Sequence, residues 1–147
     1  MKILFICRSN AERSQTAEAL FNALSKKHKA LSAGINVDME GTKGHAPGRI
    51  VTELMYSMGY DIINMKRKQL KPKMIKDSDK VVVILSNKEV KQYLPDYVKK
   101  SPKTIIWKTY LIPKSVYANF PPHTYNHHTK MVDIVQQKVK KLLKDTD

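Results

Sequence analysis

An apolar segment near the amino terminus, KILFI at residues 2–6, runs directly into Cys7, the only cysteine of the chain. Apolar side chains at consecutive positions predict a strand that is buried on both faces, as in a parallel sheet. A helical repeat of apolar residues follows, at Ala17, Leu20, Phe21 and Leu24. The segment therefore predicts a buried strand, a tight loop, and an amphipathic helix that is opened by Ser14 and runs to about Lys27.

The same two patterns alternate along the rest of the chain. Strands are predicted at residues 30–33, 80–85 and 104–107. Helices are predicted at residues 51–58, from a capping box of Ser86 and Glu89, and from about Thr129 to Lys144. Connections are predicted at residues 36–44 and 65–73. This order predicts one domain over residues 1–147, an α/β fold with a parallel sheet that carries helices on both faces.

Basic residues dominate the charge of the chain, with 27 Lys and Arg against 13 Asp and Glu and a formal net charge of +14. Such a surface attracts anions, so the expected partners are phosphorylated or other oxyanion substrates, and acidic proteins or nucleic acid. No apolar run approaches the roughly 18 residues of a membrane span, and we expect no membrane partner. A single cysteine cannot form an internal disulfide, which predicts a reducing, cytoplasmic location.

Cys7 lies at the carboxyl end of its strand, which is where ligands bind to parallel sheets. The thiolate is the nucleophilic form of cysteine, and both a helix N-terminus and the guanidinium of Arg13 favour it. Arg13 also offers a fork of donors to two oxygens of one phosphate. We therefore expect residues 8–13 to form a phosphate-binding loop (P-loop) whose amides hold an anion, with Asn10 in the left-handed conformation. The hydroxyl of Ser14 is expected to donate to the sulfur.

The expected site thus combines a nucleophile with a set of anion-binding groups. The predicted catalytic residues are Cys7, Arg13 and Ser14. The predicted substrate-binding residues are Arg8, Ser9, Asn10, Ala11 and Glu12. Attack by the sulfur through a covalent intermediate splits a difficult displacement into two easier ones.

At these residues the chain resembles the low-molecular-weight protein tyrosine phosphatase superfamily, which includes the thioredoxin-coupled arsenate reductases. The family motif Cys-x-x-Asn-x-x-Arg-Ser stands here as Cys7, Asn10, Arg13 and Ser14. Similar runs are RSQTAEALF at residues 13–21 and SAGI at residues 32–35. The resemblance implies a three-layer fold with a four-stranded parallel sheet, and a cysteinyl-phosphate held by the loop amides and Arg13. Gln15 is more similar to the reductase branch, because most of the phosphatases have proline there.

The general acid of the family has no evident counterpart in this chain. The phosphatases carry an Asp-Pro pair near the carboxyl-terminal third, whereas residues 98–132 here contain no Asp or Glu. The best positional match is Ile112-Pro113. We expect the aspartate to be absent, and His123 is the candidate to replace it, since histidine titrates near neutrality. His127 and His128 are expected with it in a surface loop, and we expect neither a metal ion nor a cofactor.

Two charged residues of the loop are unusual for this family. Glu12 precedes Arg13 directly, and a carboxylate that points into the loop would repel phosphate. We expect the Glu12 side chain to point outwards and to pair with Arg8 or a nearby lysine. Arg8 is expected at the lip of the loop, where it either selects acidic substrates or remains a solvated surface residue.

These observations predict a phosphomonoesterase that hydrolyses aryl or tyrosine phosphate through Cys7. One alternative is a single-cysteine arsenate reductase that uses an external thiol, because the two further cysteines of the thioredoxin-coupled enzymes are missing from the sequence. Another alternative is a basic anion- or nucleic-acid-binding protein that has lost the general acid. Its surface would consist of residues 65–73 and the last helix.

Overall fold

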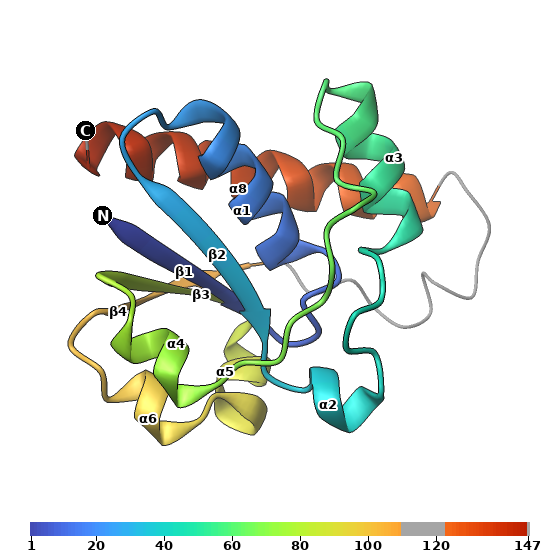
Figure 1. The fold of residues 1–147 in the computed structure, drawn as a ribbon. Coiled ribbons are helices and arrows are strands. Elements are labelled where there is room, and N and C mark those ends of the chain that lie inside the picture. The colour runs from blue at the N-terminus through green and yellow to red at the C-terminus, as the bar shows by residue number, and fades with distance from the viewer. Residues whose placement is uncertain (110–122, 147) are drawn as a thin grey trace.

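The structure is a computed structural model that describes residues 1–109 and 123–146, except for the side chains of residues 123–125. Its strands form one parallel sheet in the order β2-β1-β3-β4 (Figure 1). The strands are β1 (Lys2–Cys7), β2 (Lys29–Gly34), β3 (Lys80–Leu85) and β4 (Thr104–Lys108). The predicted four-stranded parallel sheet is confirmed, and each strand agrees with its predicted range to within a residue at either end.

Helices cover both faces of the sheet, which confirms the three-layer arrangement (Figure 1). The described helices are α1 (Arg13–Leu24), α2 (Val37–Glu40), α3 (Arg49–Ser57), α4 (Pro72–Lys76), α5 (Asn87–Tyr93), α6 (Asp96–Lys99) and α8 (His123–Thr146). The helices α1, α3 and α8 pack on one another over one face, whereas α4, α5 and α6 contribute to the core of the other face. None of these described helices is long and apolar enough to cross a membrane.

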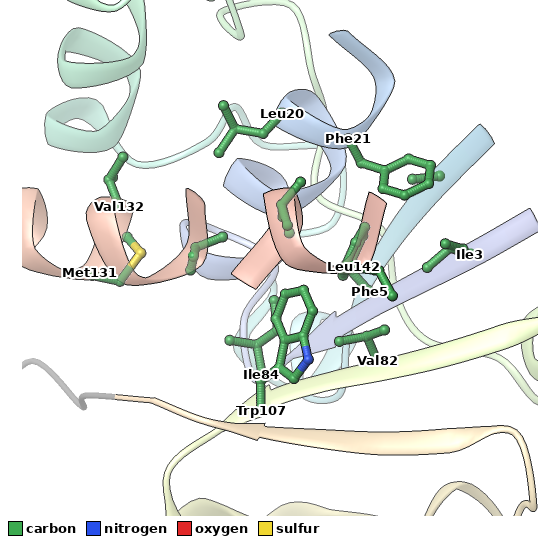
Figure 2. Packing of buried hydrophobic residues seen from close by; sticks show 14 of the residues in the cluster. Ile3, Phe5, Leu20, Phe21, Val82, Ile84, Trp107, Met131, Val132 and Leu142 are labelled. Carbon is green, nitrogen blue, oxygen red and sulfur yellow. The ribbon is translucent and has the colours of Figure 1, made fainter. Parts of the chain in front are cut away.

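The strands contribute side chains to two hydrophobic cores, one on each face of the sheet, because successive side chains of a strand point to opposite faces. In β1, Ile3 belongs to the core under α1 and α8, and Leu4 to the core beside α4 and α6. The ring of Phe5 packs on that of Phe21, with 6.0 Å between centroids, and on that of Trp107 at 5.7 Å (Figure 2). β1 is therefore buried on both faces as predicted, and its carboxyl end is held in a fixed position.

The first helix is shorter than its apolar spacing predicted. It begins at Arg13 and ends at Leu24, whereas we predicted Ser14 to about Lys27. Ser25 takes an extended backbone and donates its N–H to Phe21 O, which closes the helix. Ser14 lies inside the helix instead of capping it, and no side chain caps its N-terminus.

Two further predicted boundaries were wrong. Residues 36–44 were predicted as a connection, but they include the short helix α2. The last helix begins at His123, six residues before the predicted start at Thr129. Its first turns have the sequence HTYNHHT, which has no apolar repeat that would reveal a helix. The histidines that we predicted in a loop therefore belong to α8.

Phe21→Ala should lower the free energy of unfolding by about 3–5 kcal/mol, because the ring is fully buried and its removal leaves a cavity. Urea denaturation would measure this loss. Leu24→Ala is the matched control on the same helix, since Leu24 is 40% exposed and should cost less than about 1 kcal/mol. Equal losses for the two variants would contradict the described packing of α1.

Candidate active site

The P-loop connects the carboxyl end of β1 to the N-terminus of α1, and neighbouring backbone fixes it on two sides. Beyond β2, Ile35 N–H donates to Cys7 O at 3.0 Å and Asn36 N–H to Arg8 O at 2.9 Å. On the other side, Gly48 N–H donates to Ala11 O at 2.9 Å, just before α3 begins. The loop carbonyls are thus directed into the protein.

Asn10 is the centre of a buried hydrogen-bond network. Its φ is +51°, which confirms the predicted left-handed conformation, and the residue is fully buried. Its Nδ2 donates to Ser14 Oγ at 2.7 Å and to Ser32 Oγ at 2.9 Å. Its Oδ1 accepts from Gln15 Nε2 at 3.1 Å and from the backbone N–H of Lys68 at 2.9 Å. One side chain thereby ties the P-loop to α1, to β2 and to residues 65–73.

The sulfur of Cys7 lies beside the hydroxyl of Ser14. The Sγ–Oγ distance is 2.9 Å, and both side chains are buried. The hydroxyl also accepts a hydrogen bond from Asn10, and either atom of the Sγ–Oγ pair can be the donor in the other bond. The predicted proximity of Cys7 and Ser14 is therefore present in the structure.

Gly34, at the end of β2, touches the backbone of the P-loop. A Cβ at this position would lie 2.7 Å from Asn10 N and 2.8 Å from the carbonyl carbon of Ser9. Real Cβ contacts are essentially never that short, and the obstacle is backbone, which cannot turn away. Glycine is therefore required here because of the close approach of the loop.

The backbone N–H groups of Arg8, Ser9, Asn10 and Ala11 donate no hydrogen bond to any described residue. These consecutive donors follow the sulfur directly and precede the positive N-terminus of α1. Buried or half-buried amides need acceptors. Consecutive amides of this kind form a good site for a tetrahedral anion.

Arg13 forms a bidentate ion pair with Glu89 of α5. Nη1 lies 2.6 Å from Oε1 and Nη2 lies 2.9 Å from Oε2. Burial opposes the charged form of Arg13, but Glu89 and the charges of Cys7 and Glu12 outweigh it and raise the pKa of Arg13. Burial also acts to raise the pKa of Glu89, but the bond and charge of Arg13, together with Ser86, lower it overall. Both side chains are thus ionised and held in a fixed orientation.

We predicted Arg8 or a nearby lysine as the partner of Glu12, and the structure places a histidine of α8 beside it. Its Oε2 lies 2.7 Å from Nε2 of His128, which is 1% exposed. The prediction of a surface position for His128 was therefore wrong. It failed because the polar first turns of α8 pack directly against the P-loop. The carboxylate does point away from the loop interior, since its side chain also lies against Gly48.

The outer residues of the loop contact the elements around it. Arg8 lies over the ring of Tyr93 from α5, 4.2 Å from its centroid, so it is not simply solvated. Ser9 donates to Glu40 Oε1 of α2 at 2.7 Å. The rim of the site therefore carries one guanidinium held flat on an aromatic face.

A buried charge pair lies behind Asn10. Glu18 Oε2 accepts from Ser32 Oγ at 3.0 Å, and Lys68 Nζ lies 3.6 Å away from the same oxygen. Burial raises the pKa of Glu18, and Lys68 and Ser32 offset this only in part. Ser32 also accepts a hydrogen bond from Asn10. Lys68 is therefore connected to the P-loop through the side chains of Glu18 and Ser32.

The candidate general acid is only partly described. Ile112-Pro113 and the side chain of His123 lie outside the described residues. His127 is half-buried in α8. Within the described part of the chain, no three His, Cys, Asp or Glu side chains gather as metal ligands would.

Several residues of the site were missed from the sequence. They are Glu18, Ser32, Gly34, Lys68, Glu89 and His128. The sequence did mark Glu89 as part of a capping box with Ser86, and this prediction is confirmed. A capping box does not indicate that Glu89 also pairs with Arg13. The remaining residues contact the loop through the tertiary fold, and no local pattern marks them.

The family model that matches the chain supports the class of cysteine-dependent, phosphatase-type enzymes. The family model for low molecular weight phosphotyrosine protein phosphatases matches residues 2–146, and the chain belongs to this family. The resemblance found at the P-loop is thus confirmed over nearly the whole chain.

Solved structures of both branches share the fold. Wzb from Vibrio vulnificus in complex with benzylphosphonate has a TM-score of 0.72 and 20% identity, over 95% of this chain and 97% of that one. The tyrosine phosphatase Wzb from Escherichia coli K30 in complex with sulphate has a TM-score of 0.74 and 17% identity, over 99% and 98%. An arsenate reductase from Archaeoglobus fulgidus has a TM-score of 0.68 and 23% identity, over 96% and 98%. No protein with a curated description matches the sequence.

Glu89→Gln should lower the free energy of unfolding by about 3–5 kcal/mol at neutral pH, because it leaves Arg13 buried without its counter-charge. The lowered pKa of Glu89 means that its contribution is present above about pH 4.5 and is lost as pH falls through the folded-state value. Urea denaturation between neutral and acid pH should therefore give a flatter acid limb for the variant. Parallel curves for variant and wild type would contradict this role of the pair.

Proposed function

We propose that the protein is a phosphomonoesterase that hydrolyses aryl or tyrosine phosphate through a cysteinyl-phosphate on Cys7. The observation that carries the proposal is the placement of the Cys7 sulfur beside Ser14 and next to Arg13, at the start of a loop whose amides have no acceptor among the described residues. The reaction needs a reduced thiol, which favours a cytoplasmic location.

In the first step the sulfur attacks phosphorus, and the bond from phosphorus to the leaving oxygen breaks with its electron pair. The loop amides and Arg13 bind the equatorial oxygens, where charge is spread in the transition state. In the second step water attacks the cysteinyl-phosphate, and inorganic phosphate leaves. The Ser14 hydroxyl stabilises the departing thiolate.

Glu89 prepares Arg13 for this task. It accepts one N–H from each terminal nitrogen of the guanidinium, so three of the five donors remain for an anion. A guanidinium that is already oriented loses little freedom when it binds phosphate. Glu89 is therefore a positioning residue, and it does not touch the substrate.

When the bond from phosphorus to the leaving oxygen breaks, that oxygen either accepts a proton from the enzyme or departs as an anion. Residues 98–132 contain no Asp or Glu. We therefore propose that no carboxylic acid from this segment protonates the leaving group. General acid catalysis contributes about 10²–10⁴ in rate, so its loss affects alkyl esters most. The phenolate of an aryl phosphate leaves without such help, and His123 is the candidate acid for alkyl esters.

Arg8 is the proposed specificity residue of the rim. The ring of Tyr93 holds its guanidinium, whose Nε is buried without a hydrogen-bond partner among the described residues. A carboxylate or second phosphate beside the scissile group would supply this partner. The proposed substrates are therefore phosphoesters that carry a neighbouring negative charge.

Arsenate reduction is the second candidate, and Gln15 supports it through its similarity to the reductase branch. In this reaction the Cys7 thiolate displaces hydroxide from arsenate to form a sulfur–arsenic(V) bond. An external thiol then attacks the sulfur, so arsenite leaves with the bonding pair and a mixed disulfide forms. A second thiol molecule must reduce that disulfide, because the chain has no other cysteine.

Cys7→Ser should abolish hydrolysis of 4-nitrophenyl phosphate while the fold is retained, because serine lacks a nucleophilic anion at neutral pH. Release of nitrophenolate and the urea midpoint measure the two effects. Ser25→Ala, at the far end of α1, is the control and should keep its activity. Turnover in Cys7→Ser equal to wild type would refute the proposed nucleophile. Arsenite release that depends on added glutathione, with no phosphatase activity, would favour the second candidate.

Arg8→Ala should raise KM about tenfold for a phosphotyrosine peptide with flanking acidic residues, with little change for 4-nitrophenyl phosphate. The reason is that only the peptide carries a carboxylate for the guanidinium. Lys88→Ala, an exposed cation at the start of α5, is the charge-matched control. The same loss on both substrates would show that Arg8 serves the loop itself and not specificity.

A further inference from the structure

The parallel sheet ends in β2 on one side and in β4 on the other (Figure 1). In the outer strand of such a sheet, every second residue directs its N–H and C=O away from the neighbouring strand. These outward groups stay unpaired unless another part of the chain covers the edge. The two edges of this sheet differ in whether they are covered.

The edge of β2 is covered by side chains and by a neighbouring segment. Asn22 of α1 pairs with both backbone groups of Ala30, since Ala30 N–H donates to Asn22 Oδ1 at 2.8 Å and Asn22 Nδ2 donates to Ala30 O at 3.0 Å. Gly34 N–H donates to Lys68 O, and Leu70 N–H donates to Gly34 O, both at 2.8 Å. The strand β2 is therefore closed to a further strand.

The register of β4 identifies its outward residues. Thr109 N–H donates to Leu85 O of β3, so the odd-numbered residues of this segment face β3. The outward backbone groups therefore belong to the even-numbered residues Thr104, Ile106 and Lys108. We call the outward backbone of residues 104–108 the open edge.

The open edge has one backbone hydrogen bond to a described residue, from Thr104 N–H to Ser101 O at 3.2 Å. The N–H groups of Ile106 and Lys108 donate to none of the described residues. The carbonyl groups of Thr104, Ile106 and Lys108 accept from none of them. These groups form a row of donors and acceptors that matches the backbone of an added strand.

The side chains in the middle of β4 are apolar. Ile105 is 39% exposed and Ile106 is 38% exposed, and the two point to opposite faces of the sheet. The ring of Trp107 points into the core instead (Figure 2). Edge strands are usually protected by a charge, a proline or a bulge. β4 has Lys108 at its end, but its middle has none of the three and a regular register.

We propose that the open edge binds an extended, acidic segment of another protein, which adds to the sheet beside β4. In such complexes the backbone hydrogen bonds supply affinity and alternate side chains supply specificity. The row of backbone groups selects a polypeptide, because neither a nucleic acid nor a lipid surface carries alternating amide donors and carbonyl acceptors. An antiparallel partner is compatible with the fold, since parallel sheets commonly carry an antiparallel edge strand.

The charges around β4 favour an acidic segment. Residues 97–109 contain four lysines and no Asp or Glu. Lys138 of α8 adds a further charge above the ring of Trp107, 5.9 Å from its centroid. Two carboxylates lie at the margins: Asp96 precedes the segment, and Asp145 follows Lys138 by about 10 Å along α8. The lysines outnumber them, so the surroundings of the open edge are positive.

A second copy of the chain fits the open edge less well than an acidic partner. Pairing of two β4 strands would bring together two molecules that each have a formal net charge of +14. It would also place the lysines of both 97–109 segments at one interface, where like charges oppose association. The charge therefore favours a partner of opposite sign.

The test is the fluorescence anisotropy of a labelled heptapeptide of alternating glutamate and valine. The wild-type protein should bind it. A peptide of the same sequence with every backbone nitrogen methylated has the same side chains and charge but no amide donors, and it should bind at least about tenfold more weakly. Replacement of each glutamate by glutamine should also weaken binding, because the lysines then lose their counter-charges.

Ile106→Pro is the matching change in the protein. It removes an outward N–H and leaves the hydrogen bonds with β3 intact, since proline is tolerated at edge positions whose N–H faces solvent. The variant should bind the unmethylated peptide at least about tenfold more weakly than Ile106→Val, which keeps the N–H. Both variants should retain the urea midpoint and the hydrolysis of 4-nitrophenyl phosphate, because Ile106 is not part of the candidate active site.

Equal affinity for the methylated and unmethylated peptides would overturn the proposal, because binding would then follow charge alone. Absence of binding at about 50 mM salt would overturn it as well. Equal affinity for the glutamine peptide would refute the acidic preference. A wild-type dimer in analytical ultracentrifugation that Ile106→Pro dissociates would assign the open edge to a second copy of the chain instead. The methylated peptide tests backbone pairing on the unaltered protein, whatever the stability of Ile106→Pro.

Discussion

The buried side chain of Asn10 is the constraint on which the site depends. Its backbone has the left-handed φ that the turn requires, and its amide contacts Ser14, Ser32, Gln15 and the backbone of Lys68. Most other side chains would either resist this φ or leave these polar groups unsatisfied. Because Ser14 is also the neighbour of the Cys7 sulfur, the network sets the position of that sulfur and that of the loop at the same time.

Most of the fold could be predicted from local patterns. Buried strands such as KVVVIL are continuous apolar runs, and the capping box at Ser86 marks a helix start without tertiary information. The errors arise where tertiary contacts override the pattern. The polar beginning of α8 is helical because His128 is buried against the loop, and α1 ends early because Ser25 turns the chain towards β2.

Contacts inside the motif could be predicted from the sequence, whereas contacts around it could not. Cys7, Arg13 and Ser14 are close in sequence, so their proximity follows from one strand, one loop and one helix. Glu89 comes from an element far along the chain, and its carboxylate was predicted only as a helix cap. The prediction for Glu12 was correct about its direction but did not include His128, because a histidine on a distant helix has no local signature.

The contact between Glu12 and His128 has a consequence for biosynthesis. The P-loop is translated well before α8, the helix whose His128 holds Glu12. A nascent polypeptide therefore carries its cysteine in a loop that is not yet braced on one side. The loop therefore reaches its described arrangement only after α8 has been translated and has packed against it.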